Sequence, residues 1–218
     1  MINQTNAIFD KTIVDNVVDG ALLKNLQNDV FLFSGLKTHA QLLEASRLLL
    51  DADKKIKPLA QFTKDFLKIN ETYNRQYLEA EYQFAVASSQ MANKWSGFSD
   101  DYNLQYRTAG DSRVRDSHDK LRDTTLPKSD SFWDSFMPPN GWRCRCTAVE
   151  VLLEDYKVSD SKKAIANGET ATSQIGKDGK NKFEIFRFNP GKDKVIFPPQ
   201  HPYSKIVGSK TVISNLSK

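Results

Sequence analysis

Apolar residues in the first hundred positions recur every three or four residues, which is the period of an amphipathic helix. One helix is predicted through the run Ile13, Val14, Val17, Val18, Ala21 and Leu22. Thr38 followed by Gln41 resembles a capping box, so a further helix is expected to begin at Thr38 and to continue through LLEASRLLL.

The longest apolar stripe follows Pro58, a residue that favours the first turn of a helix. Its members are Phe62, Phe66, Ile69, Tyr73, Tyr77, Ala80, Phe84, Ala87, Met91 and Trp95. We expect this helix to end at Gly97. Its aromatic seam is interpreted as the core on which the other helices pack, and a groove for a partner protein is the alternative.

Shorter elements are predicted after Gly97. NLQYRTAG, residues 103–110, is typical of a strand that runs into a turn. A short helix from Asp111 would place one apolar face toward the core, carrying Val114, His118 and Leu121. After a proline-containing loop, RCRCTAVEVL is predicted to be a strand. Its period of two places Cys144, Cys146 and Ala148 on one face.

The C-terminal third is predicted to contain a β-hairpin, because KFEIFRF and KVIF flank the turn sequence NPGKD. Residues 159–182 are polar, contain three glycines and are expected to form a mobile loop. The sum is an α+β fold in which a helical N-terminal part packs on a small, loop-rich antiparallel β module. We expect a helical region at 1–97, the α+β module at 98–205 and a C-terminal tail at 206–218.

The composition of the 218 residues, 39% hydrophobic and 27% charged, is that of a soluble protein with a core. No apolar stretch approaches the roughly 18 residues that a membrane span needs, so no membrane partner is expected. The N-terminus lacks the order of a signal peptide, so we expect no export by the general pathway. The 2 cysteines lie too close in sequence for an unstrained disulfide, and reduced thiols are expected.

The net charge of +4 is concentrated near the C-terminus, where residues 160–218 carry 11 basic and 5 acidic side chains. This excess could contact DNA phosphates or an acidic partner. The simpler interpretation is that these lysines keep a loop-rich segment soluble.

The region between Arg107 and Val149 contains an unusual density of chemically active side chains. Two thiols at i and i+2, with the imidazole of His118, could bind zinc, and Asp111, His201 or water could supply a fourth ligand. Alternatively, Cys144 and Cys146 are small buried apolar residues. A Cys–His–Asp nucleophile with Asp111 or Asp116 is a weaker hypothesis, because both thiols are predicted to lie in the body of a strand.

Acidic and basic residues are balanced in this region, which favours a structural interpretation over acid–base or nuclease chemistry. Arg–carboxylate pairs would hold the loops together, covered by Phe132, Trp133 and Trp142. The residues assigned to this structural motif are Asp111, Arg113, Arg115, His118, Trp133, Pro139, Gly141, Trp142 and Arg145.

The same residues carry a family resemblance. The series D-x-R-V-R-x-x-H, then F-W-D, then P-P-N-G-W-x-C-R-C resembles the phage Mu F-like minor head proteins, the head morphogenesis family that includes the SPP1 minor capsid protein. The helix EAEYQFAVASSQMANKW before the motif is also similar to family members. The resemblance covers roughly residues 35–205.

The resemblance implies a non-enzymatic minor head protein of a phage or prophage, which acts in head morphogenesis. It would be assembled in the bacterial host cytoplasm, be carried in the virion and contact the portal and other head proteins. No cofactor is implied, and zinc remains open. The competing hypothesis is a metal-dependent hydrolase or nuclease that uses His118 with Cys144 and Cys146.

Overall fold

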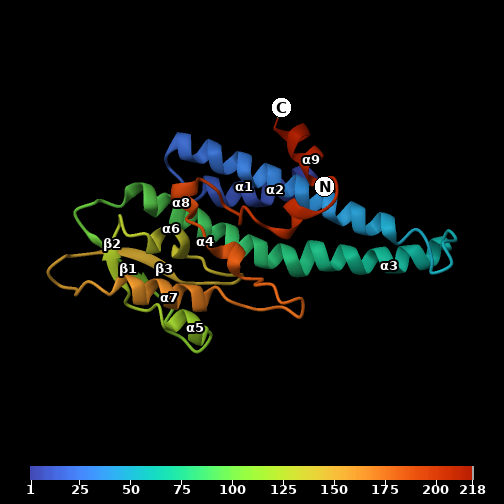
Figure 1. Ribbon diagram of the computed structural model, residues 1–218. Coiled ribbons are helices and arrows are strands. Elements are labelled where there is room, and N and C mark those ends of the chain that lie inside the picture. Colours follow the sequence, from blue (N-terminus) through green and yellow to red (C-terminus); the bar gives the residue numbers. More distant parts are fainter. Residues whose placement is uncertain (218) are drawn as a thin grey trace.

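Helices make up the N-terminal part of the chain in the computed structural model, which describes residues 1–217. They are α1 (Ile2–Val14), α2 (Gly20–Arg47), α3 (Leu59–Glu71), the π-helical η1 (Thr72–Tyr77) and α4 (Leu78–Gly97). α3, η1 and α4 follow one another directly and form one long helix beside α2 (Figure 1). α1 packs on both α2 and α4.

The predicted long helix is confirmed: it begins after Pro58 and ends at Gly97. The predicted helix across residues 13–22 is wrong, because α1 ends at Val14 and Val18 in the break is 90% exposed. The helix start at Thr38 is also wrong. Asp19 caps α2 instead, since its carboxylate accepts a hydrogen bond from the backbone N–H of Leu22 at 2.6 Å.

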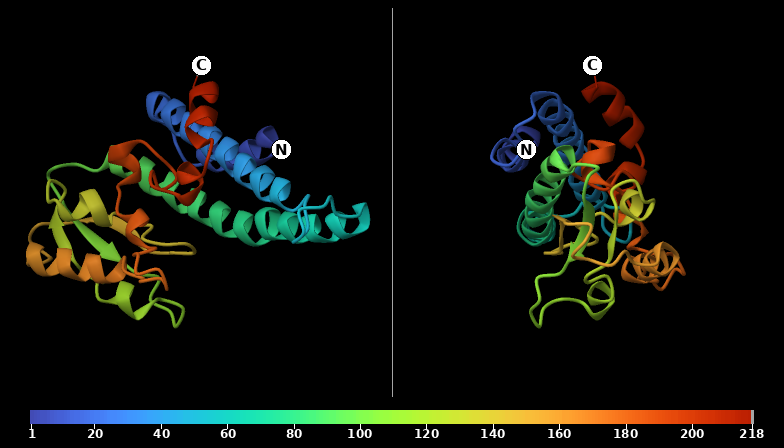
Figure 2. Two further views of the ribbon diagram at one scale, coloured as in Figure 1. Left: turned by 45° about the vertical axis from the view of Figure 1, so that its right-hand side comes forward. Right: turned by 90° about the vertical axis from the view of Figure 1, so that its left-hand side faces the viewer.

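A three-stranded sheet organises the second part of the chain. β1 (Asn103–Arg107) lies between β2 (Thr125–Pro127) and β3 (Thr147–Val151), and both pairings are antiparallel. α5 (Asp116–Asp119), α6 (Phe132–Phe136) and α7 (Ser161–Ala171) complete this module, which lies at one end of the long helix (Figures 1 and 2). The predicted α+β class, with a helical part packed on a small antiparallel module, is therefore confirmed. The division at residues 97 and 205 stays a prediction.

The predicted C-terminal hairpin is wrong. Residues 183–197 contain η2 (Glu184–Phe186) and the short helix α8 (Pro190–Asp193) instead of two strands. The backbone N–H groups of Ile196 and Phe197 donate to the carboxylate of Asp29 in α2, at 2.8 and 3.1 Å. Because this distant carboxylate satisfies them, these groups need no hairpin partner.

The segment expected to be a polar loop, residues 159–182, contains α7, whose first turn is capped by the carboxylate of Asp160. Beyond it, η3 (Pro202–Lys205) leads to α9 (Ser209–Leu216), which packs on α2. Within residues 1–217, no helix combines the length and apolar character that crossing a bilayer requires.

Two clusters of buried side chains form the core. One lies among the helices and includes Phe9, Phe33 and Phe84; the C-terminal segment adds Phe186 and Phe197 to it. The other lies under the sheet and is built around Tyr106, Leu126, Phe132, Trp133, Cys144 and Cys146, with Met91 contributed by α4. The long helix therefore contributes to both clusters.

Candidate functional site

The two cysteines lie in an extended segment directly before β3, which begins at Thr147. Their predicted position in the body of a strand is therefore wrong by a few residues. The predicted alternation of buried and exposed side chains is present, however: both thiols are buried, while Arg145 between them is exposed. The extended backbone places both sulfur atoms on the inner side because alternate side chains of an extended chain point the same way.

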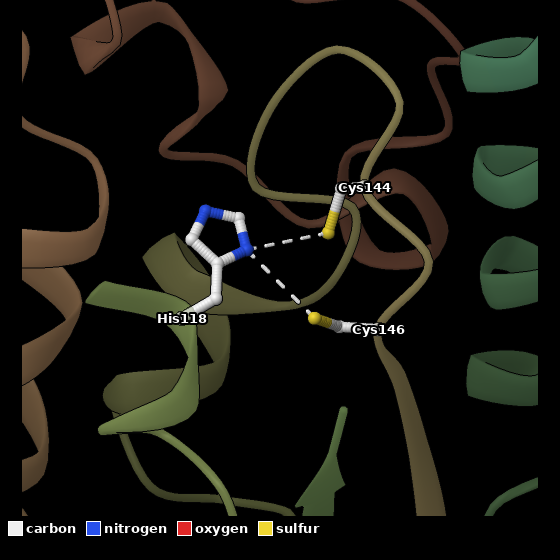
Figure 3. A group of neighbouring side chains, drawn as sticks. All are labelled: His118, Cys144 and Cys146. Atoms are coloured by element: carbon white, nitrogen blue, oxygen red, sulfur yellow. Dashed lines mark hydrogen bonds between the residues drawn. The ribbon is translucent and has the colours of Figure 1, made fainter. Parts of the chain in front are cut away.

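His118 reaches the two thiols from α5. Its Nδ1 atom lies 3.6 Å from Sγ of Cys144 and 3.7 Å from Sγ of Cys146 (Figure 3). His118 is 2% exposed and each cysteine is 7% exposed. Tertiary folding therefore brings together the three side chains named as potential zinc ligands. We call them the Cys–His cluster.

The two thiols have opposite protonation preferences. The hydrogen bond from Cys146, together with the nearby imidazole, holds the pKa of Cys144 well below its usual value. The same hydrogen bond and burial raise the pKa of Cys146.

Asp111 and Arg145 form a two-pronged ion pair, with N–O distances of 2.7 and 2.6 Å. This hydrogen bonding keeps the pKa of Asp111 below its usual value. Arg113 approaches the same carboxylate at 3.4 Å. Arg115 donates from Nη2 to the backbone carbonyl of Trp142 at 2.6 Å. These contacts join the loop at 111–115 to the segment at 142–145, and their role in holding the module together stays a prediction.

The predicted aromatic cover over this network is wrong. Trp133 is fully buried under the sheet, where its Nε1 atom donates to the carbonyl of Leu126 at 3.4 Å. Trp142 belongs to the helical core, where it contacts Phe84 edge to face. Asp111 and Arg145 stay partly exposed, because charged groups keep their hydration unless burial is compensated.

Pro139 and Gly141 shape the loop that leads to the cysteines. Pro139 is buried, and the backbone N–H of Cys144 donates to the carbonyl of Gly141 at 3.1 Å. A side chain at Gly141 would have its Cβ 3.3 Å from Nη1 of Arg115. Glycine therefore lets the guanidinium approach the loop closely.

A cavity of about 380 Å³ adjoins the Cys–His cluster. Four guanidinium groups surround it, those of Arg113, Arg115, Arg143 and Arg145, and the carboxylate among the lining residues is Glu79 of α4. Glu79 also approaches Arg143, at 3.8 Å. The sequence prediction missed Glu79 because it occupies an exposed helix position that no local pattern distinguishes.

The two other side chains considered as a fourth metal ligand lie apart from the cluster. Asp111 is held by Arg145, and Nδ1 of His201 accepts a hydrogen bond from the backbone N–H of Tyr203 at 3.2 Å. Among residues 1–217, the group able to hold a metal consists of His118, Cys144 and Cys146.

A larger groove of about 1060 Å³ adjoins the cavity beside the Cys–His cluster, since Glu79 and Arg143 line both; Tyr73, Tyr77 and Trp142 are among its other lining residues. Near it, the sequence prediction also missed a buried ion pair between Lys37 and Glu81. Lys37 lies in α2, and Glu81 lies in α4 beside Ala80 of the apolar stripe. A sequence pattern does not show that two such charges face each other.

These features define a class of small α+β protein: a long helix joined to a sheet module that contains a Cys–His cluster and a network of polar contacts between loops. The model of the phage Mu protein F like family matches residues 36–149, just over half of the chain. The chain therefore belongs to this family, as the sequence motif indicated. Protein F of Escherichia phage Mu, whose name describes a capsid assembly protein, is 43% identical over 42 residues.

That alignment covers 19% of this chain and 10% of the phage Mu protein, so the chain matches a small part of its relative. No solved structure matches the chain.

Proposed function

We propose that this chain is a minor head component of a phage or prophage, that it acts in head assembly without catalysis, and that it contacts the portal. The observation that carries this proposal is membership of the phage Mu protein F like family. The name of the phage Mu relative supports a role in capsid assembly. The chain would be assembled in the host cytoplasm and carried in the virion.

The end of the helical hairpin is the surface that we assign to the portal contact. Leu50 and Ile56 pair across the connection between α2 and α3, and Leu59 follows at the start of α3. Ile56 is 83% exposed and Leu59 78%. We call Leu49, Leu50, Ile56 and Leu59 the hairpin tip.

The tip lies at the end of the long helix opposite the sheet module (Figure 1). Single exposed apolar residues are common, but several that adjoin at a projecting end favour a protein contact. The family resemblance supplies the identity of the partner.

Binding to the portal protein of the same phage tests this assignment. The double variant Ile56→Ser/Leu59→Ser should bind purified portal protein at least about tenfold more weakly, since removing buried contacts from an interface centre costs over 1 kcal/mol. Val18→Ser, which changes an equally exposed residue outside the tip, should bind like the unaltered chain. Equal portal binding by both variants would refute the tip as the contact.

Mass spectrometry of purified heads from an induced lysogen tests the virion assignment itself. The polypeptide should be present in intact heads at low copy number. Its absence from intact heads would defeat the proposed function, whatever the outcome of the portal experiment.

A metal-dependent hydrolase or nuclease is the second candidate, and the arginine-lined cavity beside the Cys–His cluster is the observation that favours it. Such an enzyme needs a base near the metal-bound water, and Glu79 is the carboxylate that lines this cavity. We favour the non-catalytic role because Glu79 is directed to Arg143 and the cluster is buried. Zinc-dependent cleavage of a phosphodiester that Glu79→Gln abolishes would establish the enzyme instead.

DNA binding through the basic C-terminal part has weaker support. Lys192, one of its cations, is paired with Asp134 at 2.6 Å. Binding through this part would be independent of sequence and would weaken steeply with salt. If DNA binding survives deletion of residues 206–218 and neutralisation of Lys192 and Lys194, the basic C-terminal part is excluded as the DNA contact.

A further inference from the structure

We infer that the Cys–His cluster is a zinc site, in which Nδ1 of His118 and the Sγ atoms of Cys144 and Cys146 hold one Zn²⁺ ion. The fourth coordination position faces the arginine-lined cavity and takes water. This inference is independent of the proposed function, because a zinc ion that fixes the sheet module would serve any role of the protein.

The distances from the imidazole nitrogen to the two sulfur atoms already match a zinc tetrahedron. Typical Zn–S and Zn–N bonds with tetrahedral angles place a sulfur and a nitrogen ligand about 3.6 Å apart. Nδ1 of His118 lies 3.6 and 3.7 Å from the two sulfur atoms, and all three ligand atoms lie within 4.8 Å of one another (Figure 3). One ion can therefore reach all three without a rearrangement of the backbone.

The donor set also suits zinc. Two thiolates and an imidazole form a soft set of ligands, which binds zinc in preference to magnesium or calcium. The two thiolate charges balance the charge of the ion. The guanidinium groups of Arg113 and Arg115 line the cavity that adjoins these donors.

The imidazole supplies an independent observation. Its Nε2 atom is buried and has no hydrogen-bond partner among the residues that the structure describes. The hydrogen bonds of the ring are therefore those of Nδ1 with the two sulfur atoms. Coordination at Nδ1 would place the proton on Nε2 and fix the orientation of the ring.

The ion would connect two loops that are distant in sequence. His118 belongs to α5 beyond β1, whereas the cysteines precede β3, and few backbone hydrogen bonds join these segments directly. Binding of metal to the folded state stabilises that state, so the sheet module should be more stable with zinc than without it.

Metal analysis of untagged chain, purified without chelator, tests the inference. We expect one zinc per chain and two thiols that react with a thiol reagent only after the metal is removed. After removal, Co²⁺ should give the thiolate charge-transfer bands and the strong visible bands of a tetrahedral thiolate site. The thermal midpoint should fall when zinc is removed and recover when it is added back.

The variants Cys144→Ser, Cys146→Ser and His118→Asn should each lose the bound zinc. His39→Asn, which changes a histidine outside the cluster, should retain it. If cluster variants fail to fold, the Co²⁺ spectrum of the unaltered chain still decides. The site is refuted if the purified chain contains no zinc and also binds none in a titration against a chromogenic chelator. It is also refuted if the cobalt spectrum shows no thiolate bands. Neither result bears on the head-assembly assignment, which is tested separately by mass spectrometry of purified heads and by portal binding.

Discussion

Replacing Glu81 by Leu would leave the ammonium group of Lys37 buried without its counter-ion. The side chains of Lys37 and Glu81 are 2% and 3% exposed and form a direct ion pair between α2 and α4. Tyr203 donates its hydroxyl to the same carboxylate at 3.0 Å. Burial lowers the pKa of Lys37 and raises that of Glu81, and the charge of each partner opposes the effect on the other.

The expected loss of stability follows from two estimates. Removing one member of a buried ion pair typically costs about 3–5 kcal/mol. Alternatively, Lys37 could lose its proton, which at pH 7 costs about 1.36 kcal/mol per pH unit below its usual pKa of 10.5, or about 4.8 kcal/mol. Both routes give a similar value, so Glu81→Leu should lower the thermal midpoint by roughly 6–20 °C.

A double-mutant cycle with Lys37→Met separates the pair from the packing around it. Each single variant should be strongly destabilised in urea denaturation followed by tryptophan fluorescence. The double variant Lys37→Met/Glu81→Leu should recover most of the loss, because no unpaired charge stays buried. Single variants that lose less than about 1 kcal/mol, or a double variant that loses the sum of both, would refute this reasoning.

Two further predictions concern stability. Burial lowers the pKa of His201 to about 3. The neutral side chain therefore adds fully to the free energy of unfolding above its unfolded pKa of about 6.5. This stabilisation is lost as pH falls toward 3, by at most about 1.36 kcal/mol per pH unit. Urea midpoints between pH 7 and pH 4 should therefore fall less steeply in His201→Gln, and an unchanged slope would contradict the assignment. Gly168→Ala would place its Cβ 2.5 Å from Cγ of Phe136 and should cost about 1–3 kcal/mol in the same denaturation assay. Gly20→Ala meets no atom within 4 Å and should be neutral or slightly stabilising; equal losses in both variants would show that crowding against Phe136 is not the cause.

Local patterns in the sequence determined the elements whose own residues suffice to specify them. The stripe from Phe62 to Trp95 predicts one long helix because its period holds for the whole length, and Pro58 and Gly97 mark its ends. The spacing of Cys144 and Cys146 predicts that both thiols point the same way, since that depends only on extended backbone. The ordered motif also identified the family.

Tertiary contacts decided the rest. The carboxylate of Asp29 satisfies the backbone donors of Ile196 and Phe197, so a segment with the pattern of a hairpin packs on the helices instead. The approach of His118 to the thiols and the pairing of Lys37 with Glu81 likewise join residues far apart in sequence. A local pattern records which face of an element is apolar, but it does not record which distant group satisfies the hydrogen bonds and charges on that face.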